Sequence, residues 1–318
     1  MMHKINSESS QDNRTLSIQA GEAGIRLDRY LTSVFTGISR TVVQQLIVDG
    51  AVLVNGHTGK SGYMLRSGDE VQVFLLNMHN KPINIKPQSL PLDIVYEDKD
   101  LLVVNKAAGM VVHPAPGHYD DTLVNALIAR YPDIQREDSE QRPGIVHRLD
   151  KDTSGLIIIA RNAAIHSALA EQMKRHEIVK RYLALVEGIV ALDKGSIDAP
   201  IGRNPRHRQQ MAITVVGSRA ARTHFRVLER FARHTLLLLE LETGRTHQIR
   251  VHLKAIGHPI VGDPVYGSGS KIRGSALKQQ FLHAYQLKFT HPTTGTSVDL
   301  EAPLPQDLQA ILDQKSFL

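Results

Sequence analysis

The sequence of 318 residues predicts an α+β fold, in which a small N-terminal domain precedes a mixed, largely antiparallel sheet with flanking helices. Helix and strand patterns alternate irregularly beyond residue 92, which favours this class over a regular parallel wound fold. Three prolines fall within 78–92, where the apolar residues lose their periodicity, as is typical of a linker. We therefore expect a flexible tail over 1–20, a small domain over 21–77, a linker over 78–92 and the larger domain over 93–318.

The small domain begins with helical periodicity. Leu27, Leu31 and Val34 repeat at intervals of four and three residues, which places them on one apolar helix face. Ser39 is expected to cap a second helix. The next segment, AVLVNG, alternates and then reaches Asn-Gly at 55–56, a strong hairpin signal. Two short helices followed by a small sheet are the expected result.

The elements of the larger domain follow from local patterns. The segment 94–106 predicts two strands around an acidic turn, and the uniformly apolar run at 155–161 predicts a buried strand. Amphipathic or apolar patterns predict helices over 121–131 and 164–176 and further strands over 181–190 and 235–244.

Composition narrows the classes of function. The net charge of +6 and the pI near 9.4 favour a polyanionic partner. The sequence has no cysteine, which excludes disulfides, thiolate zinc sites and cysteine nucleophiles. No apolar run approaches the roughly 20 residues needed to cross a bilayer, and the N-terminus lacks the apolar region of a secretion signal. We therefore expect a cytoplasmic protein that does not enter a membrane.

The segment HRLDKDTSG at 147–155 carries two carboxylates, Asp150 and Asp152. In an extended loop, residues two apart point to opposite sides, so both cannot face one substrate. A pair of carboxylates working together, as in glycosidases, is thus disfavoured here. One carboxylate should act alone, although an aspartate in such a loop also suits a purely structural turn.

The segment LETGRTHQIRVHLKAIGHP at 241–259 predicts a strand, a turn and a helix whose N-cap would be Thr246. Arg245 would lie at the mouth of that helix and Arg250 about one turn inside it. Together with free backbone amides, they could hold a phosphate or a buried carboxylate, and an ordinary surface helix is the alternative. His247 and His252 would lie about 140° apart, too far around the helix to share a metal.

The local sequence gives two other residues an ordinary structural interpretation. Tyr182 opens a strand, where a tyrosine is most often a core residue with a satisfied hydroxyl. Lys106 is expected at the surface. The sequence also lacks a phosphate-binding glycine loop and a nucleophile-elbow motif, so nucleotide hydrolysis and dehydrogenase chemistry have no support. We expect no metal and no cofactor.

Several basic residues occur in the small domain, and their charge alone indicates an ordinary solvent-exposed face. The order RLDRYL, SRTVVQQLI and GAVLVNG within 24–75, however, resembles the α-L RNA-binding module of a ribosomal protein of the small subunit. The resemblance implies that these residues bind RNA: Arg26, Arg29, Arg40 and Lys60.

Five ordered motifs within 91–305 resemble the RluA family of pseudouridine synthases. They are NKAAGMVVHPAPGH (105–118), GIVHRLDKDTSGL (144–156), KRYLALVEG (180–188), TGRTHQIRVHL (243–253) and GHPIVGDPVYG (257–267). The chain departs from the family at Ala107, where proline is common and would stiffen the loop. The resemblance implies the pseudouridine synthase fold and the isomerisation of uridine in RNA.

The resemblance also assigns roles position by position. It makes Asp150 the nucleophile, Tyr182 the residue that packs on the target base and Arg250 the partner of the aspartate. Arg148 would fill the vacancy left by a flipped base, and Ile249 would line the pocket. These roles are chemically sound, because base flipping costs a few kcal/mol and a buried carboxylate needs a partner to stay ionised. We expect Arg245 to contact RNA as well.

The opening PLDIVYEDKDLLVVNK, the attached α-L module and the basic segment GRNPRHRQQM resemble the subfamily of ribosomal large subunit pseudouridine synthase D. This likeness implies an enzyme that modifies large-subunit ribosomal RNA and contributes to ribosome maturation. The oligomeric state stays open, with a monomer as the default expectation. A transfer RNA target, a non-catalytic assembly factor and a DNA-binding regulator remain as alternatives. The sequence leaves open which uridines react and whether the aspartate attacks the sugar or the base.

Overall fold

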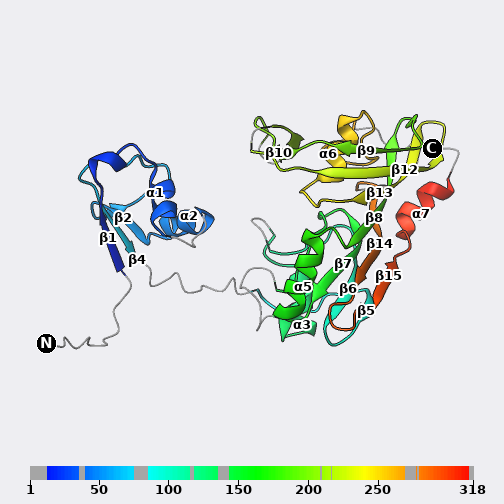
Figure 1. Ribbon diagram of the computed structural model, residues 1–318, viewed down its shortest axis with the longest axis horizontal. Coiled ribbons are helices and arrows are strands. Elements are labelled where there is room, and N and C mark those ends of the chain that lie inside the picture. Colours follow the sequence, from blue (N-terminus) through cyan, green and yellow to red (C-terminus); the bar gives the residue numbers. More distant parts are fainter. Residues whose placement is uncertain are drawn as a thin grey trace. The chain divides into compact units, whose positions relative to one another are not determined.

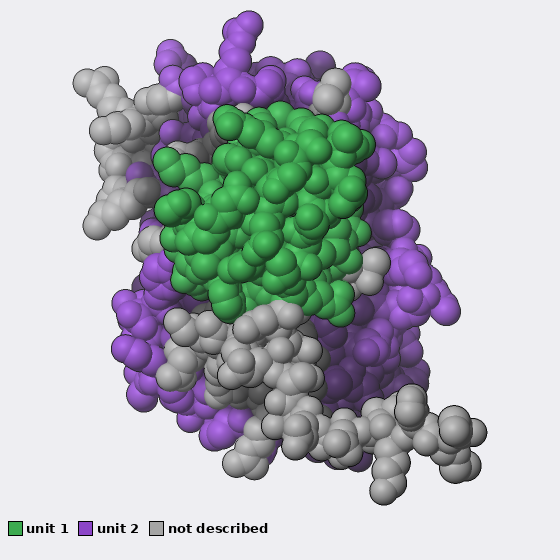
Figure 2. All heavy atoms as spheres, turned by 90° about the vertical axis from the view of Figure 1, so that its left-hand side faces the viewer, with its two compact units in different colours: residues 1–84 green, residues 85–318 purple. Residues whose placement is uncertain are grey.

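The structure, a computed structural model, describes residues 13–35, 40–74, 85–114, 118–134, 143–207, 210–215, 217–268, 277 and 279–314. The chain divides into two compact units, residues 1–84 and 85–318 (Figures 1 and 2). Ser39, with its predicted capping role, and residues 1–12 of the predicted tail lie outside the described residues, as do 78–84 of the predicted linker.

The first unit packs two helices against a small sheet. The helices are α1 (Leu27–Val34) and α2 (Arg40–Val48), preceded by the short 3-10 helix η1 (Ala20–Glu22). The strands are β1 (Asn13–Ser17), β2 (Val52–Val54), β3 (His57–Thr58) and β4 (Glu70–Phe74), in the order β1-β4-β2-β3. Asn55 and Gly56 both have positive φ, at 52° and 78°, as a two-residue hairpin turn between β2 and β3 requires.

Strand β1 corrects one expectation, since it lies within the segment predicted as a tail. It pairs antiparallel with β4, from Asn13 opposite Phe74 to Ser17 opposite Glu70. Its sequence, NRTLS, is mostly polar and has no clear alternation, so the hydrogen bonds to β4 stabilise the strand without a local signal.

The second unit is built on a nine-stranded sheet in the order β5-β6-β7-β14-β8-β13-β12-β9, with β15 paired to β14. Its strands are β5 (Ile94–Glu97), β6 (Leu101–Lys106), β7 (Ser154–Ala160), β8 (Val179–Glu187), β9 (Lys194–Asp198), β12 (Arg222–Arg230), β13 (His234–Leu241), β14 (Leu282–Thr290) and β15 (Ser297–Glu301). A separate hairpin joins β10 (Ile201–Arg203) and β11 (Met211–Ile213). Among the described strand pairs, only β7 with β14 is parallel, so the predicted mixed, largely antiparallel sheet is confirmed.

Helices cover both faces of this sheet at β6 and β7. Leu102 and Ile157 face a core that includes α3 (Leu123–Arg130), whereas Leu101 and Ile158 face a core that includes α5 (Ala163–Lys174). Successive strand residues point to opposite faces, which explains why β7 reads as a continuous apolar run. The remaining helices are α6 (Gln248–Ala255) and α7 (Gln306–Asp313) (Figure 1).

The parallel pairing between β7 and β14 is short and tight. It joins Ser154 to His283 and Gly155 to Ala284, and Ser154 Oγ lies 2.8 Å from His283 Nδ1. Gly155 has φ +111°, and a Cβ added there would lie 2.3 Å from the Ala284 carbonyl oxygen. The glycine of the TSG motif is therefore required by the contact between two strands.

Residues 85–92, the described part of the predicted linker, form no regular secondary structure but pack on the second unit. Ile85 is buried in the main core, and the backbone N–H of Gln88 donates to the Asn125 carbonyl. No helix among the described residues is long and apolar enough to span a bilayer.

Candidate active site

One pocket in the second unit brings together six residues singled out from the sequence. The loop before β7 contributes Arg148 and Asp150, β8 contributes Tyr182, and the turn and first residues of α6 contribute Arg245, Ile249 and Arg250. Asp152 does not line the pocket, in agreement with the prediction that only one of the two carboxylates faces it. The catalytic and RNA-binding roles of the six residues stay predictions.

Asp150 is held by Arg250, whose Nη1 donates to Asp150 Oδ2 at 3.1 Å. The same guanidinium binds Asp263 more extensively, through Nε to Oδ2 at 2.7 Å and Nη2 to Oδ1 at 2.9 Å. Asp263 is fully buried and Arg250 nearly so, whereas the Asp150 side chain keeps 18% of its surface exposed. Asp263 thus fixes the plane of Arg250, and Arg250 presents an Nη1–H to Asp150.

Charge supports this arrangement. Burial raises the pKa of Asp263, but the hydrogen bonds and charge of Arg250 outweigh that effect and leave the pKa below its usual value. Asp263 is therefore ionised and forms a buried bidentate pair. Two carboxylates share one guanidinium, and only the one that borders the pocket is open to a substrate.

Tyr266 and His247 form a second support beside Asp150. The Tyr266 hydroxyl accepts from the Met211 backbone N–H at 2.8 Å and lies 2.8 Å from His247 Nδ1. The charge of Asp150 near Nε2 favours a proton on that nitrogen, which leaves Nδ1 to accept from the Tyr266 hydroxyl. Neutral His247 then carries its own proton on Nε2, which lies 4.0 Å from Asp150 Oδ2.

His247 also corrects the predicted start of the helix. The N-cap of α6 is His247, in a left-handed conformation with φ 55°, and not Thr246. This region of φ/ψ space is uncommon for residues other than glycine, although histidine is among the side chains enriched there. Burial lowers the pKa of His247 despite the opposing charge of Asp150. The lowered pKa favours the neutral ring. Gln248 secures the turn, since its Oε1 accepts from the Arg245 backbone N–H at 3.0 Å.

Tyr182 is 6% exposed and lines the pocket from the sheet. Burial and the negative charge of Asp150 raise its pKa, so the phenol stays protonated. The ring is therefore a flat apolar surface with a hydroxyl that can donate a hydrogen bond. Ile249, 4% exposed, adds an apolar wall, while Arg148 is exposed and free to reach outward.

Lys106 overturns the expectation of a surface lysine. It is 1% exposed, and its ammonium donates to the carbonyls of Ala107, Met110 and Lys151 at 2.8, 2.9 and 3.0 Å. Burial lowers its pKa to about 7, opposed by the charges of Asp152 and Asp150. Lys106 thereby fastens the 107–110 loop to the loop that carries Asp150.

The residues predicted to bind RNA from the first unit lie within that unit. Arg26 and Arg40 both donate to the buried carboxylate of Asp28, at 3.0 and 2.6 Å. Arg29 and Lys60 are exposed.

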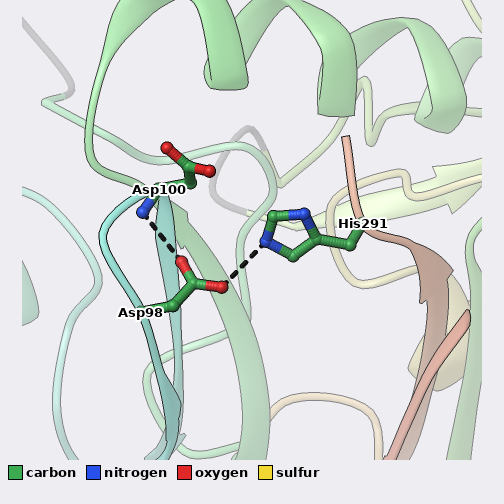
Figure 3. A group of neighbouring side chains, drawn as sticks. All are labelled: Asp98, Asp100 and His291. Carbon is green, nitrogen blue, oxygen red and sulfur yellow. Dashed lines mark hydrogen bonds and ion pairs between the residues drawn. The ribbon is translucent and has the colours of Figure 1, made fainter. Parts of the chain in front are cut away.

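A group of potential metal ligands lies away from the pocket lining: Asp98, Asp100 and His291 (Figure 3). His291 Nδ1 accepts from the backbone N–H groups of Thr293 and Thr294, at 3.2 and 3.3 Å. Its proton is therefore on Nε2, which donates to Asp98 Oδ2 at 2.8 Å. With both ring nitrogens engaged, this group is a hydrogen-bonded tie between the β5–β6 turn and the end of β14.

Comparison with known proteins identifies the fold and the chemistry. Residues 100–255 match the family described as RNA pseudouridylate synthase, and residues 25–71 match the S4 domain. A Bacillus subtilis protein named as an uncharacterized RNA pseudouridine synthase is 48% identical over 91% of this chain and 93% of its own length. The chain belongs to the RNA pseudouridine synthase family. It is an isomerase, and the resemblance to the RluA family predicted from its motifs is confirmed.

Two further relatives of this pseudouridine synthase extend the comparison. Ribosomal large subunit pseudouridine synthase D of Xanthomonas campestris is 43% identical over 91% of this chain and 88% of that protein. The solved structure of human RNA pseudouridylate synthase domain containing 1 is 33% identical, with a TM-score of 0.56, over 69% of this chain and 85% of that one. Both agree with a pseudouridine synthase domain preceded here by an S4 domain.

Sequence reasoning missed three supporting residues of this pseudouridine synthase: Asp263, Tyr266 and Gln248. Asp263 and Tyr266 lie in the GHPIVGDPVYG motif, which carried the resemblance but suggested no role for them. A pairing rule for buried arginines could have pointed to Asp263, since Arg250 on the buried face of α6 needs an acidic partner.

Proposed function

We propose that this enzyme converts specific uridines of large-subunit ribosomal RNA to pseudouridine in the cytoplasm, acts as a monomer and contributes to ribosome maturation. The observation that carries the chemistry is the Asp150 carboxylate, which borders a pocket between Tyr182 and the Arg250–Asp263 pair. The relatives named ribosomal large subunit pseudouridine synthase D, 40–43% identical over most of the chain, support the choice of RNA.

The reaction breaks the bond between the base nitrogen and the sugar, rotates the uracil, and rejoins it through carbon. The ring nitrogen gains a proton and the ring carbon loses one, so atoms balance without any co-reactant. The target uridine first leaves its stack, at a cost of a few kcal/mol. Arg148, exposed at the pocket rim, is suited to fill the vacancy and to meet phosphate.

Inside the pocket, the uracil would lie on the Tyr182 ring. The Asp150 carboxylate, oriented by Arg250, would then attack the anomeric carbon of the sugar or the uracil ring. The protonated Tyr182 hydroxyl can donate to the base or hold a water that moves the proton of the ring carbon.

The test is a map of pseudouridines in ribosomal and transfer RNA from cells with and without the protein. We expect sites to disappear from large-subunit ribosomal RNA and to return when the wild-type gene is restored. Loss confined to transfer RNA would refute the proposed substrate, and an unchanged map in both RNAs would refute cellular activity. Tritium release from uracil-labelled RNA by the purified chain checks turnover independently of the cell.

A further inference from the structure

A second cavity adjoins the active-site pocket and shares Arg148, Tyr182 and Arg245 with it. It extends toward Lys174 on α5 and Lys180 on β8. Four of its described lining residues are arginines or lysines, and they outnumber the carboxylates, represented there by Glu242 alone. The cavity is therefore suited to an anion.

Glu242 does little to neutralise these cations, because it is already paired outside the cavity. Its Oε1 lies 2.6 Å from His224 Nε2, and its Oε2 accepts from Arg222 Nη1 at 3.3 Å. Neither His224 nor Arg222 lines the cavity.

Lys180 is the unusual member of the set. It is 7% exposed, and the hydrogen bond that its ammonium makes goes to Met173 Sδ at 3.5 Å. A thioether is a weak acceptor, so a buried ammonium gains little from it. Burial lowers the pKa of Lys180, as expected for a cation without an acidic partner among the described residues.

Lys106 shows what a lysine with a purely structural role looks like in the same domain. Lys106 is buried even more completely than Lys180, but three backbone carbonyls accept from its ammonium. Lys180 has the burial without the acceptors, and it borders a cavity that leads to Asp150. A molecule that enters the cavity can therefore supply the acceptors that Lys180 lacks among the described residues.

We propose that Lys180, with Arg148 and Arg245 at the junction of the two cavities, binds a phosphate of the RNA backbone next to the target uridine. Lys180 and Tyr182 lie two residues apart on β8 and point to the same face, about 7 Å from each other along the strand. A base that rests on Tyr182 thus brings the phosphate of its own or the adjoining nucleotide near Lys180. This proposal rests on the proposed function, because it requires the target base to lie on Tyr182.

The first experiment tests the phosphate directly, with the full chain and the variant Lys180→Met, which keeps the length and removes the amine. In protein labelled with ¹³C-lysine, the Lys180 signal is assigned by its absence from the variant. We expect uridine 3′-monophosphate or uridine 5′-monophosphate to shift this signal and raise its pKa, and uridine alone to leave it unchanged. An equal shift with uridine, or no shift with either monophosphate at saturation, would overturn the proposal.

The second experiment measures turnover on total RNA from cells that lack the protein. Lys180→Met should raise KM about ten- to a hundredfold, as expected for the loss of a charged hydrogen bond, with kcat within about twofold of wild type. The dependence of log KM on log salt should become shallower by nearly one. Lys288→Met, on the neighbouring strand β14 and outside both cavities, should change neither quantity.

A fall in kcat with unchanged KM would overturn the proposal, since Lys180 would then act by supporting Tyr182. The nucleotide titration requires neither turnover nor the natural substrate. A failure to find pseudouridine in large-subunit ribosomal RNA would therefore refute the proposed function without affecting the phosphate cavity. A negative nucleotide titration would refute the phosphate cavity without affecting the proposed function.

Discussion

Asp28 in the first unit and Asp150 in the second are both aspartates beside arginines, but their surroundings differ. Asp28 is fully buried and accepts hydrogen bonds from Arg26, Arg40 and Gln44. Burial raises its pKa, but these three donors outweigh that effect and hold the pKa far below its usual value. Asp28 is saturated with partners and cannot react.

Asp150 has fewer partners and more space. Among the described residues, Arg250 at 3.1 Å and His247 at 4.0 Å both approach Oδ2. Oδ1 is left for a substrate. The contrast teaches that an ion pair alone does not mark a catalytic carboxylate: the mark is a carboxylate that is oriented on one oxygen and incompletely satisfied on the other.

The largest expected effect on turnover is that of a substitution at Asp150. Asp150→Asn keeps the shape but removes the charge, and turnover should fall by at least about 10⁴-fold, as for the loss of other nucleophiles. The measurement is pseudouridine formed per enzyme on total RNA. Asp152→Asn, outside the pocket lining, is the matched control and should retain turnover within about tenfold. A near-normal rate for Asp150→Asn would contradict the mechanism.

At Asp28 the corresponding change should affect stability. Asp28→Asn leaves two arginines without their anion, and we expect the first unit to lose about 2–3 kcal/mol of stability. The side chains of Arg26 and Arg40 are 42% and 45% exposed, so water offsets part of the loss. Hydrogen exchange of α1 and α2 in the full chain measures this, with the strands of the second unit as an internal reference. Equal protection in the variant would show that the Asp28 cluster contributes little.

The same cluster predicts a dependence on pH. Because the folded-state pKa of Asp28 is lowered, its stabilisation is present above the unfolded value of about 3.9 and is lost as pH falls below it toward the folded value. Unfolding of the first unit should therefore become easier in acid. Asp28→Asn should flatten that part of the profile, and a profile identical to wild type would exclude Asp28 as its source.

Asp263→Asn tests whether Arg250 needs its second carboxylate. The change weakens the bidentate pair, so Arg250 is free to turn fully toward Asp150 and saturate it as Asp28 is saturated. We expect kcat to fall about a hundredfold, the effect of a small misplacement at a reacting group, while RNA binding changes little. Single-turnover kinetics separate the two. A loss confined to RNA affinity would contradict this role.

The smallest effect concerns the tautomer of His247. Tyr266→Phe removes the hydroxyl that directs a proton to Nδ1, and kcat should fall about two- to tenfold, in the range of one neutral hydrogen bond. Nitrogen-15 NMR of the histidine ring should show a loss of the single Nε2–H form. If the variant keeps that form, then Tyr266 does not fix the tautomer.

Local patterns predicted the parts of the fold that depend on local chemistry. The apolar run of β7 and the Asn55-Gly56 hairpin follow from burial on two faces and from turn geometry, and both could be read directly. Strand β1 could not, because its stability lies in pairing with β4, more than fifty residues away in the sequence. The pairing partner leaves no trace in the local composition of β1.

The candidate site likewise contains residues that the sequence predicted and residues that it did not. The motifs predicted Asp150, Tyr182 and Arg250, and the structure brings all three to one pocket. The burial of Lys106 depends on carbonyls from two separate loops, so its local sequence looks like that of a surface lysine. The partner of Arg250, Asp263, follows it by thirteen residues, and no periodicity links the two positions.

The short parallel pairing of β7 with β14 has a consequence for alignment. Asp150 lies just before β7, whereas Tyr182 and Arg250 belong to the part of the domain beyond β14. The described ladder between β7 and β14 consists of Ser154 and Gly155 against His283 and Ala284. A side chain at position 155 would move the nucleophile relative to the base platform by whatever distance the strands separate. Because a misplacement of about 1 Å at a reacting group can cost about a hundredfold in rate, this two-residue pairing helps to keep Asp150 aligned with Tyr182.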